Sequence, residues 1–326
     1  MTSVWPAPVG LPIGDSGAVI TVGTFDGVHR GHHDVLTRLA ARAVETDRPS
    51  VVVTFEPHPL EVVRPSAAPP LLTLHDEKLE MFAQSGVSYV AVLPFTATLA
   101  AYEAEQFVDA VLRERFRVAE LLVGHDHGFG RGRLGDIAVL QALGASRGFG
   151  VTVLPPVHAS DGQAISSTMI RKAIAAGDLS TAAAGLGRPY SLTGRVIRGD
   201  QRGRLIGYPT LNLQPPPARK LLPPDGVYAV RVQTPQGPHL GMLNLGPRPT
   251  FGDVARRIET HVFDAAHDWY GAAVRLDLIA RLRDTRSFAG IEALRAQLAL
   301  DEMAARHALS YTLRGPATAA TSGPLS

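Results

Sequence analysis

The chain has 326 residues, of which 45% are hydrophobic and 19% charged, so it is typical of a soluble globular protein but too long for one ordinary compact core. The formal net charge is only +2, from 32 Lys and Arg against 30 Asp and Glu. Because no basic block stands out, this balance argues against a nucleic-acid partner. The chain has no cysteine, which excludes disulfides, thiolate catalysis and cysteine-ligated zinc.

The ends and the apolar runs of the chain bear on its location. Residues 1–13 lack the basic start and apolar core of a signal peptide, and no apolar run approaches the length of a membrane span. We therefore expect a cytoplasmic protein without a membrane partner. A homo-oligomer stays open.

The first half of the sequence alternates short apolar runs with amphipathic stretches, which predicts a parallel sheet covered by helices on both faces. The strands are expected at residues 18–22, 51–55, 89–93, 121–123 and 151–154. A helix between the first two is predicted by apolar residues on one face, namely Leu36, Leu39, Ala40, Ala43 and Val44. Thr73 followed by Asp76 predicts another helix start, with Leu79 and Phe82 behind it.

The pattern continues with helices at 136–146, 167–176 and 178–186 and then changes near Gly187. Alternating segments follow, and they are typical of a β-barrel: 191–197, 226–232, 240–245, 259–263 and 274–280. Ile291, Leu294 and Leu298 predict a final helix over about 288–307. We thus expect an α/β domain at 14–187, a barrel domain at 188–312 and a disordered tail at 313–326.

Residues 23–32, GTFDGVHRGH, follow the first predicted strand and begin the first predicted helix. Gly23 and Gly27 permit a tight turn and close approach of a ligand, and a helix N-terminus attracts phosphate. His29 and His32 are three residues apart, so both imidazoles can donate to phosphate oxygens from one face. A metal half-site would need a third protein ligand, and a lone helical pair is more often structural. The carboxyl end of a strand favours ligand binding.

These residues resemble the GxFDGVHxGH signature of the bacterial bifunctional riboflavin kinase/FAD synthetases, and the HRGH core resembles the HxGH motif of nucleotidylyltransferases. Residues 53–59, VTFEPHP, and 165–171, ISSTMIR, match two further blocks of that family. The resemblance implies a Rossmann-like adenylyltransferase domain of the HxGH type. It also implies a set of phosphate-binding residues in these blocks: Gly23, Phe25, Gly31, Ser166, Ser167, Thr168 and Arg171.

The block at 124–130, GHDHGFG, stands where the family reads GxDFxFG. His127 replaces the family's aromatic residue, which puts a stacking contact there in doubt. The resemblance implies flavin contacts from Asp126 and from His58 of the second block. A metal site at 125–127 is not expected, because neighbouring strand residues point to opposite faces.

A second glycine-rich segment covers residues 194–213 and lacks the GxxxxGK[ST] pattern of a P-loop. Glycines at Gly199, Gly203 and Gly207 suit a loop that holds phosphate by its N–H groups. Thr210 and Asn212 are two residues apart, so on an extended segment their oxygens face one way, as Mg²⁺ ligands could. Without further context this is only a glycine-rich hairpin.

The same segment resembles the riboflavin kinase signature GxxxxGxxxGxxxGFPTAN, with Tyr208 for Phe and Leu211 for Ala. The resemblance continues through blocks at 224–229, 244–251, 259–261, 269–271 and 282–284. It implies that Glu259 is the general base toward the ribityl 5′-hydroxyl and that Arg283 helps to anchor flavin.

Together the two resemblances imply an enzyme that phosphorylates riboflavin to FMN and then adenylylates FMN to FAD, with ATP as co-substrate and Mg²⁺ as cofactor. Its small-molecule partners would be riboflavin, FMN, FAD and ATP. Two other readings stay open: a kinase whose adenylyltransferase domain is impaired, and a flavin or nucleotide sensor without turnover.

Overall fold

The computed structural model describes residues 3–6, 14, 16–125, 135–247, 256–265 and 267–313. The chain packs into two compact units. The first contains Met1–Arg171, Gly185–Gly187 and Arg219–Leu221, and the second contains Lys172–Ala184, Arg188–Ala218 and Leu222–Ser326. None of the helices in the described ranges has both the length and the apolar character needed to cross a membrane.

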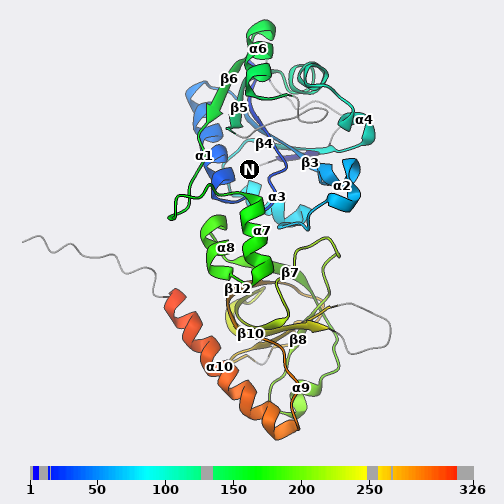
Figure 1. Ribbon diagram of the computed structural model, residues 1–326, viewed down its shortest axis with the longest axis vertical. Helices are drawn as coiled ribbons and strands as arrows, with labels where there is room; N and C mark the ends of the chain where they lie inside the picture. The colour runs from blue at the N-terminus through cyan, green and yellow to red at the C-terminus, as the bar shows by residue number, and fades with distance from the viewer. Residues whose placement is uncertain are drawn as a thin grey trace, which may run out of the picture. The chain divides into compact units, whose positions relative to one another are not determined.

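The first unit is built on a six-stranded parallel sheet in the order β1-β4-β3-β2-β5-β6 (Figure 1). Its strands are β1 (Ser3–Pro6), β2 (Ala18–Val22), β3 (Ser50–Glu56), β4 (Tyr89–Pro94), β5 (Val118–Gly124) and β6 (Gly150–Leu154). The helices that connect them are α1 (Arg30–Glu45), α2 (Pro59–Val63), α3 (His75–Ala83), α4 (Ala97–Ala100), α5 (Ala104–Phe107) and α6 (Ile137–Arg147). Short 3-10 and π segments lie at Pro65–Ala67 and Val108–Arg113. After β6 come α7 (Ser167–Ala176) and α8 (Leu179–Leu186).

Two hydrophobic layers cover the sheet, because successive strand residues alternate between its faces. Val19 on β2 packs in the layer of Leu36 from α1 and Phe82 from α3. Its neighbour Ile20 packs in the opposite layer with Leu140 from α6. The α/β sheet covered on both faces is therefore confirmed, and with it the carboxyl edge at which parallel sheets bind ligands.

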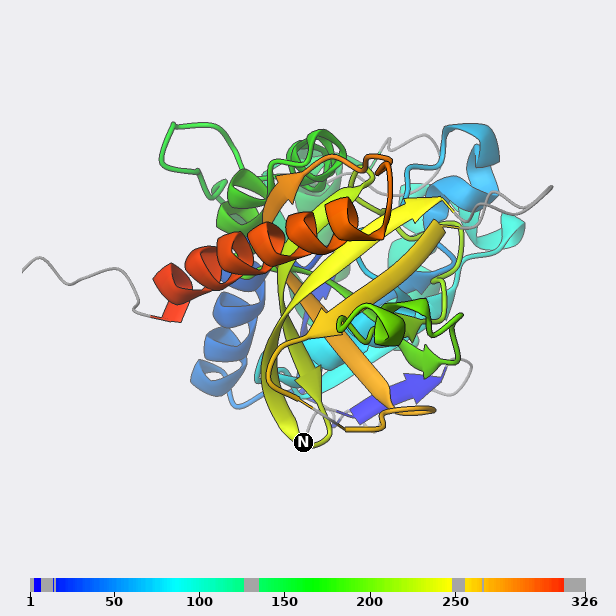
Figure 2. The ribbon, with the colours of Figure 1, turned by 90° about the horizontal axis from the view of Figure 1, so that it is seen from below.

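The second unit is a closed antiparallel barrel in the order β10-β11-β8-β7-β12-β9. Its strands are β7 (Tyr190–Ile197), β8 (Leu211–Leu213), β9 (Gly226–Thr234), β10 (Gly237–Pro247), β11 (Arg256–Val262) and β12 (Ala273–Arg283). The short helix α9 (Arg202–Leu205) joins β7 to β8, and α10 (Ile291–Leu313) ends the described chain. Figure 2 shows α10 lying along the barrel, where Ala305 and Leu309 pack with Ala229 and Met242. The barrel with a terminal helix is confirmed.

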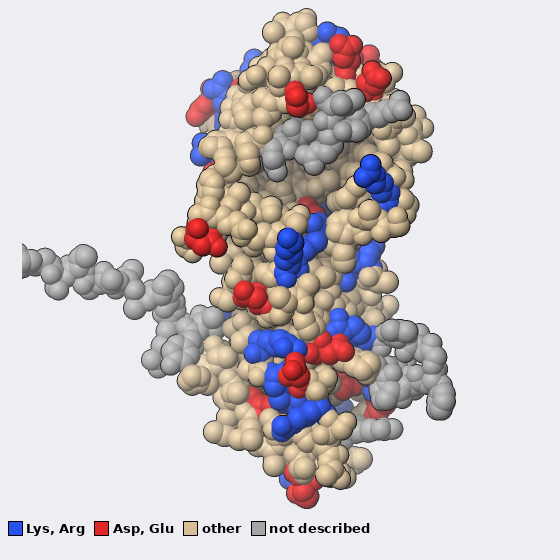
Figure 3. Space-filling model, in the orientation of Figure 1, with Lys and Arg blue, Asp and Glu red and all other residues tan. Residues whose placement is uncertain are grey.

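Basic and acidic side chains are interspersed on the face of the molecule in Figure 3. In the barrel unit many of them form ion pairs, such as Arg256 with Asp225 and Arg257 with Asp200. Charge is therefore balanced locally on this unit by neighbouring side chains.

Four details of the sequence prediction need correction. Val44 was predicted on the buried face of α1 but is 83% exposed. The apolar face of this helix is centred on Leu39 and Ala43, and Val44 lies at its edge. Thr73 does not begin a helix: its hydroxyl serves the 23–28 turn, and α3 begins at His75 with Leu74 as its N-cap.

The final helix begins at Ile291, three residues later than predicted, and Ile291 itself is 62% exposed. Its buried positions are instead Asp301, Ala305 and Leu309. The strand β1 was not predicted. The helix continues to Leu313, about six residues past its predicted end, and so includes the first residue of the tail predicted at 313–326; residues 314–326 lie outside the described residues.

Candidate functional sites

The turn between β2 and α1 has an unusual backbone. Phe25, Gly27 and Val28 all have positive φ, at 51°, 86° and 37°. Left-handed conformations at two non-glycine residues are strained, and such strain concentrates at functional sites. Gly23 lies at the start of the turn and donates its N–H to the carbonyl of Val53 on β3, so the turn is tied to the carboxyl edge of the sheet.

Two N–H groups of this turn, those of Phe25 and Asp26, have no hydrogen-bond partner among the described residues. Both are buried residues, at 3% and 4% exposure. Buried N–H groups are almost always paired, so this pair points to a ligand. The first turn of α1 carries no acidic side chain, which leaves its positive dipole end available to an anion.

The structure brings His29 and His32 together at this helix start. Their rings stack with centroids 3.7 Å apart, and Nδ1 of each accepts the backbone N–H of the other, at 3.4 and 3.3 Å. This reciprocal cap assigns the hydrogen of each neutral ring to Nε2. Both rings can thus donate from Nε2 while Nδ1 caps the helix. Gly31 leaves room for this stack, because a Cβ there would lie 3.1 Å from Cε1 of His29.

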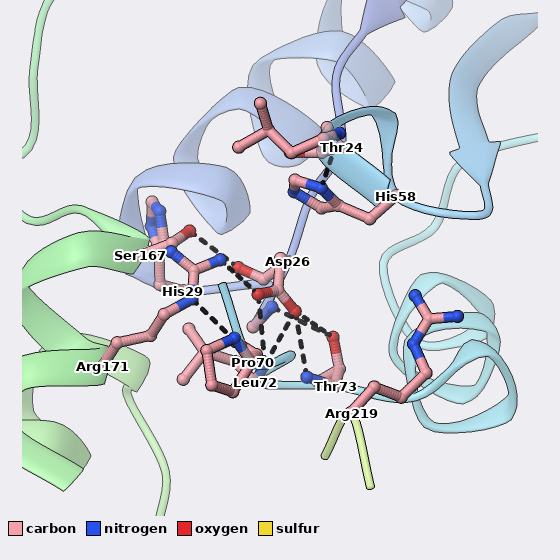
Figure 4. Close-up of polar contacts among 12 residues, drawn as sticks. Thr24, Asp26, His29, His58, Pro70, Leu72, Thr73, Ser167, Arg171 and Arg219 are labelled. Carbon is pink, nitrogen blue, oxygen red and sulfur yellow. Dashed lines mark hydrogen bonds and ion pairs between the residues drawn. The ribbon is translucent and has the colours of Figure 1, made fainter. Parts of the chain in front are cut away.

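Asp26 is the hub of the first site (Figure 4). Its carboxylate accepts the N–H groups of Leu72 and Thr73 at 3.0 Å and pairs with Arg171 at 2.6 Å. The hydroxyl of Ser167 donates to the Asp26 carbonyl at 2.9 Å. One buried carboxylate therefore joins the turn, the segment before α3 and the start of α7.

The residues of the 165–171 block occupy the start of α7. Ser166 accepts the N–H of Met169, as an N-cap does, and Thr168 is exposed. The Arg171 guanidinium is held by Asp26 and by the carbonyl of Pro70, with 16% of its side chain exposed. The charge of Arg171 is thus largely balanced by a carboxylate, a partner that sequence reasoning did not foresee.

His58 caps α2 beside Asp26. Its ring Nδ1 accepts the backbone N–H of Leu60 at 3.2 Å, and the backbone N–H of His58 donates to the Glu61 carboxylate. Burial lowers the pKa of His58, Asp26 opposes that shift, and Arg171, among other cations, adds to it. His58 is therefore neutral at neutral pH. Asp126 lies outside the described residues.

We expect His58 to impose a pH dependence on stability. Its folded pKa lies below the usual 6.5, so the unfolded chain binds more protons as pH falls through that value, and the free energy of unfolding decreases. His58→Asn keeps a capping acceptor but does not titrate. Denaturant unfolding of both proteins from pH 7.5 to 5.5 should show the parent losing stability relative to the variant. A difference that is constant with pH would contradict the assignment.

Sequence reasoning missed two cations of the first unit. Lys78 on α3 is 6% exposed. Its ammonium donates to the carbonyls of Thr24, after β2, and of Phe55, at the end of β3. A lysine four residues before buried Phe82, hence on the same helix face, was the signal that could have revealed it. Arg219 forms ion pairs with Glu56 and Glu61 beside His58. Arg219 lies about 160 residues after these glutamates in the sequence, so no local pattern predicted the pairing.

The second site lies on the outer face of the barrel. Glu259 on β11 is the register partner of Asn212 on β8, so their side chains share one face. The interior residues Leu211, Leu213 and Thr260 are buried, which fixes that face as the outer one. Arg257 donates to Glu259 at 3.2 Å and to Asp200 at 2.9 Å. The barrel thus brings the carboxylate and the amide together.

The glycines predicted here fulfil separate steric needs. A Cβ at Gly199 would overlap the side-chain amide of Asn212, and one at Gly203 would overlap the carbonyl of Tyr208. Gly207 has φ of 84°. The loop can therefore close over Asn212 only with glycine at these positions.

A cavity of about 170 Å³ opens beside Thr210. It is lined by polar, aromatic and apolar side chains, among them Arg204, Pro209, Leu211, Trp269 and Tyr270. Such a mixture suits a planar heterocycle carrying anionic groups. Thr210 lines this cavity and lies two residues before Asn212, just ahead of β8.

The oxygens of Thr210 and Asn212 fit Mg²⁺, which takes hard oxygen ligands and often binds through one or two protein groups plus substrate phosphates. Asn212 lies beside Glu259, and no lysine or arginine bond to its amide occurs in the described part of the chain. The donor set is thus suited to a phosphate-bound ion.

Arg283 does not bond to the described residues of that outer face; its carboxylate partner is on α10. Its guanidinium binds both carboxylate oxygens of Asp301 on α10, at 2.6 to 3.0 Å, and Asp301 is 3% exposed. It also lies 5.8 Å from the centre of the Phe288 ring. Arg283 therefore fastens the end of β12 to α10.

Comparisons with known proteins match both halves of the chain. A family model described as FAD synthetase matches residues 12–169, and one described as riboflavin kinase matches residues 186–309. The first range contains the residues of the first site except Arg171 and Arg219, and the second range contains the residues of the second site.

Curated relatives extend over nearly the whole chain. A bifunctional riboflavin kinase/FMN adenylyltransferase of Escherichia coli is 40% identical over 297 residues, covering 91% of this chain and 94% of the relative. The protein of the same name from Pseudomonas fluorescens is 40% identical over 291 residues, covering 89% and 92%. That from Listeria monocytogenes is 36% identical over 296 residues, covering 90% and 92%.

A solved structure from Streptococcus pneumoniae, described as a macrolide-efflux protein, superposes with a TM-score of 0.83 at 31% identity. The match covers 93% of this chain and 98% of that one. The two-unit architecture is therefore shared with a solved protein along almost its entire length.

Proposed function

Because this chain belongs to the family of bifunctional riboflavin kinase/FMN adenylyltransferases, we propose how its two units divide two consecutive reactions. The enzyme phosphorylates riboflavin to FMN and adenylylates FMN to FAD, using ATP in both steps. We assign the second reaction to the sheet unit and the first to the barrel unit.

In the sheet unit, a phosphate oxygen of FMN would attack the α-phosphorus of ATP, and pyrophosphate would leave. No protein nucleophile is required, so positioning and charge stabilisation would supply the catalysis. The observation that carries this assignment is the reciprocal cap, which leaves a hydrogen on Nε2 of both His29 and His32 at the start of α1. With the N–H groups of Phe25 and Asp26, these donors would bind the phosphates as negative charge develops.

Other residues of the first site would hold this arrangement. Gly23 and Gly31 give the turn and the ring stack their space, and Ser166, Ser167 and Thr168 would offer hydroxyls near the phosphates. Arg171, paired with Asp26, would fix α7 on the turn while adding positive charge. Flavin contacts would come from His58, which is neutral by burial, and from Asp126.

In the barrel unit, Glu259 would accept the proton of the ribityl 5′-hydroxyl as the γ-phosphoryl group moves. Arg257 would orient the carboxylate, and the cavity beside Thr210 would receive the nucleotide. The glycines Gly199, Gly203 and Gly207 would hold the phosphates, and Arg283 would support the flavin side through α10. When bound between Thr210 and Asn212, Mg²⁺ would neutralise charge on the transferring phosphates.

We propose that the enzyme works in the cytoplasm on small molecules alone, with Mg²⁺ accompanying ATP and without nucleic acid or membrane. A homo-oligomer is compatible with this proposal.

Two product assays test the assignment. Purified protein given riboflavin, ATP and Mg²⁺ should form FMN and then FAD, separable by chromatography. Given FMN instead of riboflavin, it should form FAD and pyrophosphate. Formation of FMN without FAD would favour a kinase with an impaired first unit, and bound flavin without ADP release would favour a sensor.

Gly199→Ala should impair the kinase selectively. The new methyl group would overlap the Asn212 amide and displace a proposed Mg²⁺ ligand, so we expect FMN formation to fall by about tenfold or more. FAD formation from FMN should be unchanged. Gly290→Ala is the matched control, because a Cβ there meets no atom within 4 Å. Equal kinase rates in the two variants would contradict the role of this loop.

A further inference from the structure

Lys78 is a buried cation with no counter-ion among the residues that the structure describes. It lies on the inward face of α3, 6% exposed, and its ammonium donates to the carbonyls of Thr24 and Phe55 and to the hydroxyl of Thr54, at 3.3 to 3.4 Å. All three acceptors are neutral. Within the described ranges, no carboxylate lies at ion-pair distance from this ammonium.

Burial of an unpaired charge is unfavourable, and burial accordingly lowers the pKa of Lys78, while the more distant carboxylates of Glu56 and Asp26 oppose that shift. A bound anion would stabilise such an unpaired buried charge, so the charge would in turn favour binding of the anion. The phosphates of ATP and FMN are anions that this unit would bind on the adjoining turn.

The contacts of Lys78 connect it directly to that turn. Thr54 and Phe55 belong to β3, and Thr24 follows β2, so the ammonium joins the ends of two neighbouring strands. The carbonyl of Thr24 points at the ammonium. In a trans peptide the N–H points opposite to the carbonyl, so the N–H of Phe25 points away from Lys78.

That same N–H belongs to the buried residue Phe25 and, like the N–H of Asp26, has no hydrogen-bond partner among the described residues. A cation on the carbonyl side of a peptide orients the peptide and polarises its N–H, which becomes a stronger donor. The positive φ of Phe25, 51°, is a strained conformation that needs such support.

We propose that Lys78 is a positioning residue of the adenylyltransferase site: it holds the Thr24–Phe25 peptide with its N–H toward the ATP phosphates and supplies positive charge beneath them. It acts through the peptide and does not touch the reacting atoms. This inference rests on the proposed function of the first unit.

The test compares Lys78→Met with Lys172→Met in the full chain. Methionine matches lysine in length, and removing an unpaired buried charge removes its desolvation cost, which offsets the loss of its three hydrogen bonds. Lys172 is exposed, so it controls for the loss of one positive charge. For Lys78→Met we expect kcat/KM for FAD formation to fall about ten- to a hundredfold, with KM for ATP raised, only a small decrease in melting temperature and an unchanged kinase rate.

A purely structural lysine would give a different pattern, in which the melting temperature and both activities fall together. Lys78→Arg, which keeps the charge, should retain more adenylyltransferase activity than Lys78→Met; equal loss in both would overturn the proposal. Unchanged kinetics of Lys78→Met in an active parent would also overturn it. A parent that forms no FAD at all would count against the proposed function instead.

Discussion

Glu259→Gln should reduce riboflavin phosphorylation by about 10²- to 10⁴-fold, the range typical of losing a positioned general base. Glutamine keeps the volume of the side chain and can still contact Asn212, its register partner, but it cannot accept the proton of the 5′-hydroxyl. FMN formation from riboflavin, followed by chromatography at saturating ATP, measures this loss. FAD formation from supplied FMN should be unaffected, because that reaction belongs to the other unit.

The control for this variant is Glu292→Gln. Glu292 lies at the start of α10 with 89% of its side chain exposed, so the same chemical change there should leave both reactions intact. A kinase rate in Glu259→Gln equal to that of the control would remove Glu259 from its proposed role.

The second large effect concerns the imidazole pair. In the double variant His29→Asn, His32→Gln we expect FAD formation to fall by about 10²- to 10³-fold, the loss typical of removing donors to a charged transition state. Asparagine at the N-cap and glutamine three residues later form a capping box of their own. The helix start should therefore survive, and a loss of activity would reflect the missing Nε2–H donors.

His33→Gln is the matched control, since His33 is exposed on the next position of the same helix. Thermal unfolding of the double variant should match that of the control, and FMN formation should match that of the parent. If both reactions fell equally in the double variant, separate sites in the two units would be refuted.

The fold class could be predicted because hydrophobic periodicity is strong in both halves. Runs such as Ile20 and its neighbours on β2 are buried on both faces of the sheet, so they are apolar throughout. Boundaries were harder. Thr73 resembles an N-cap in the sequence, but Asp26 and Gly27, some 46 residues away, engage its hydroxyl. No local pattern encodes that competition.

The site divides in the same way. His29 and His32 could be placed together because a helix N-cap and the residue three positions later lie on one face. Thr210 precedes β8, so its pairing with Asn212 as a Mg²⁺ ligand stays a prediction. The pairing of Arg171 with Asp26 and of Arg283 with Asp301 could not be predicted, since each joins residues distant along the chain. Lys78 was overlooked because a lysine near a helix start is ordinarily exposed.

The three residues Arg219–Leu221 have a consequence for dissecting the protein. Leu71 and Lys220 form a backbone bridge, and the Lys220 ammonium binds Glu77 at 2.6 Å, with 1% and 8% of the two side chains exposed. Cutting the gene after Gly187 would keep the glutamate and discard the lysine. Removing one partner of a buried pair typically costs about 3–5 kcal/mol. The first unit expressed as residues 1–187 should therefore have a markedly lower free energy of unfolding than the same unit in the full chain.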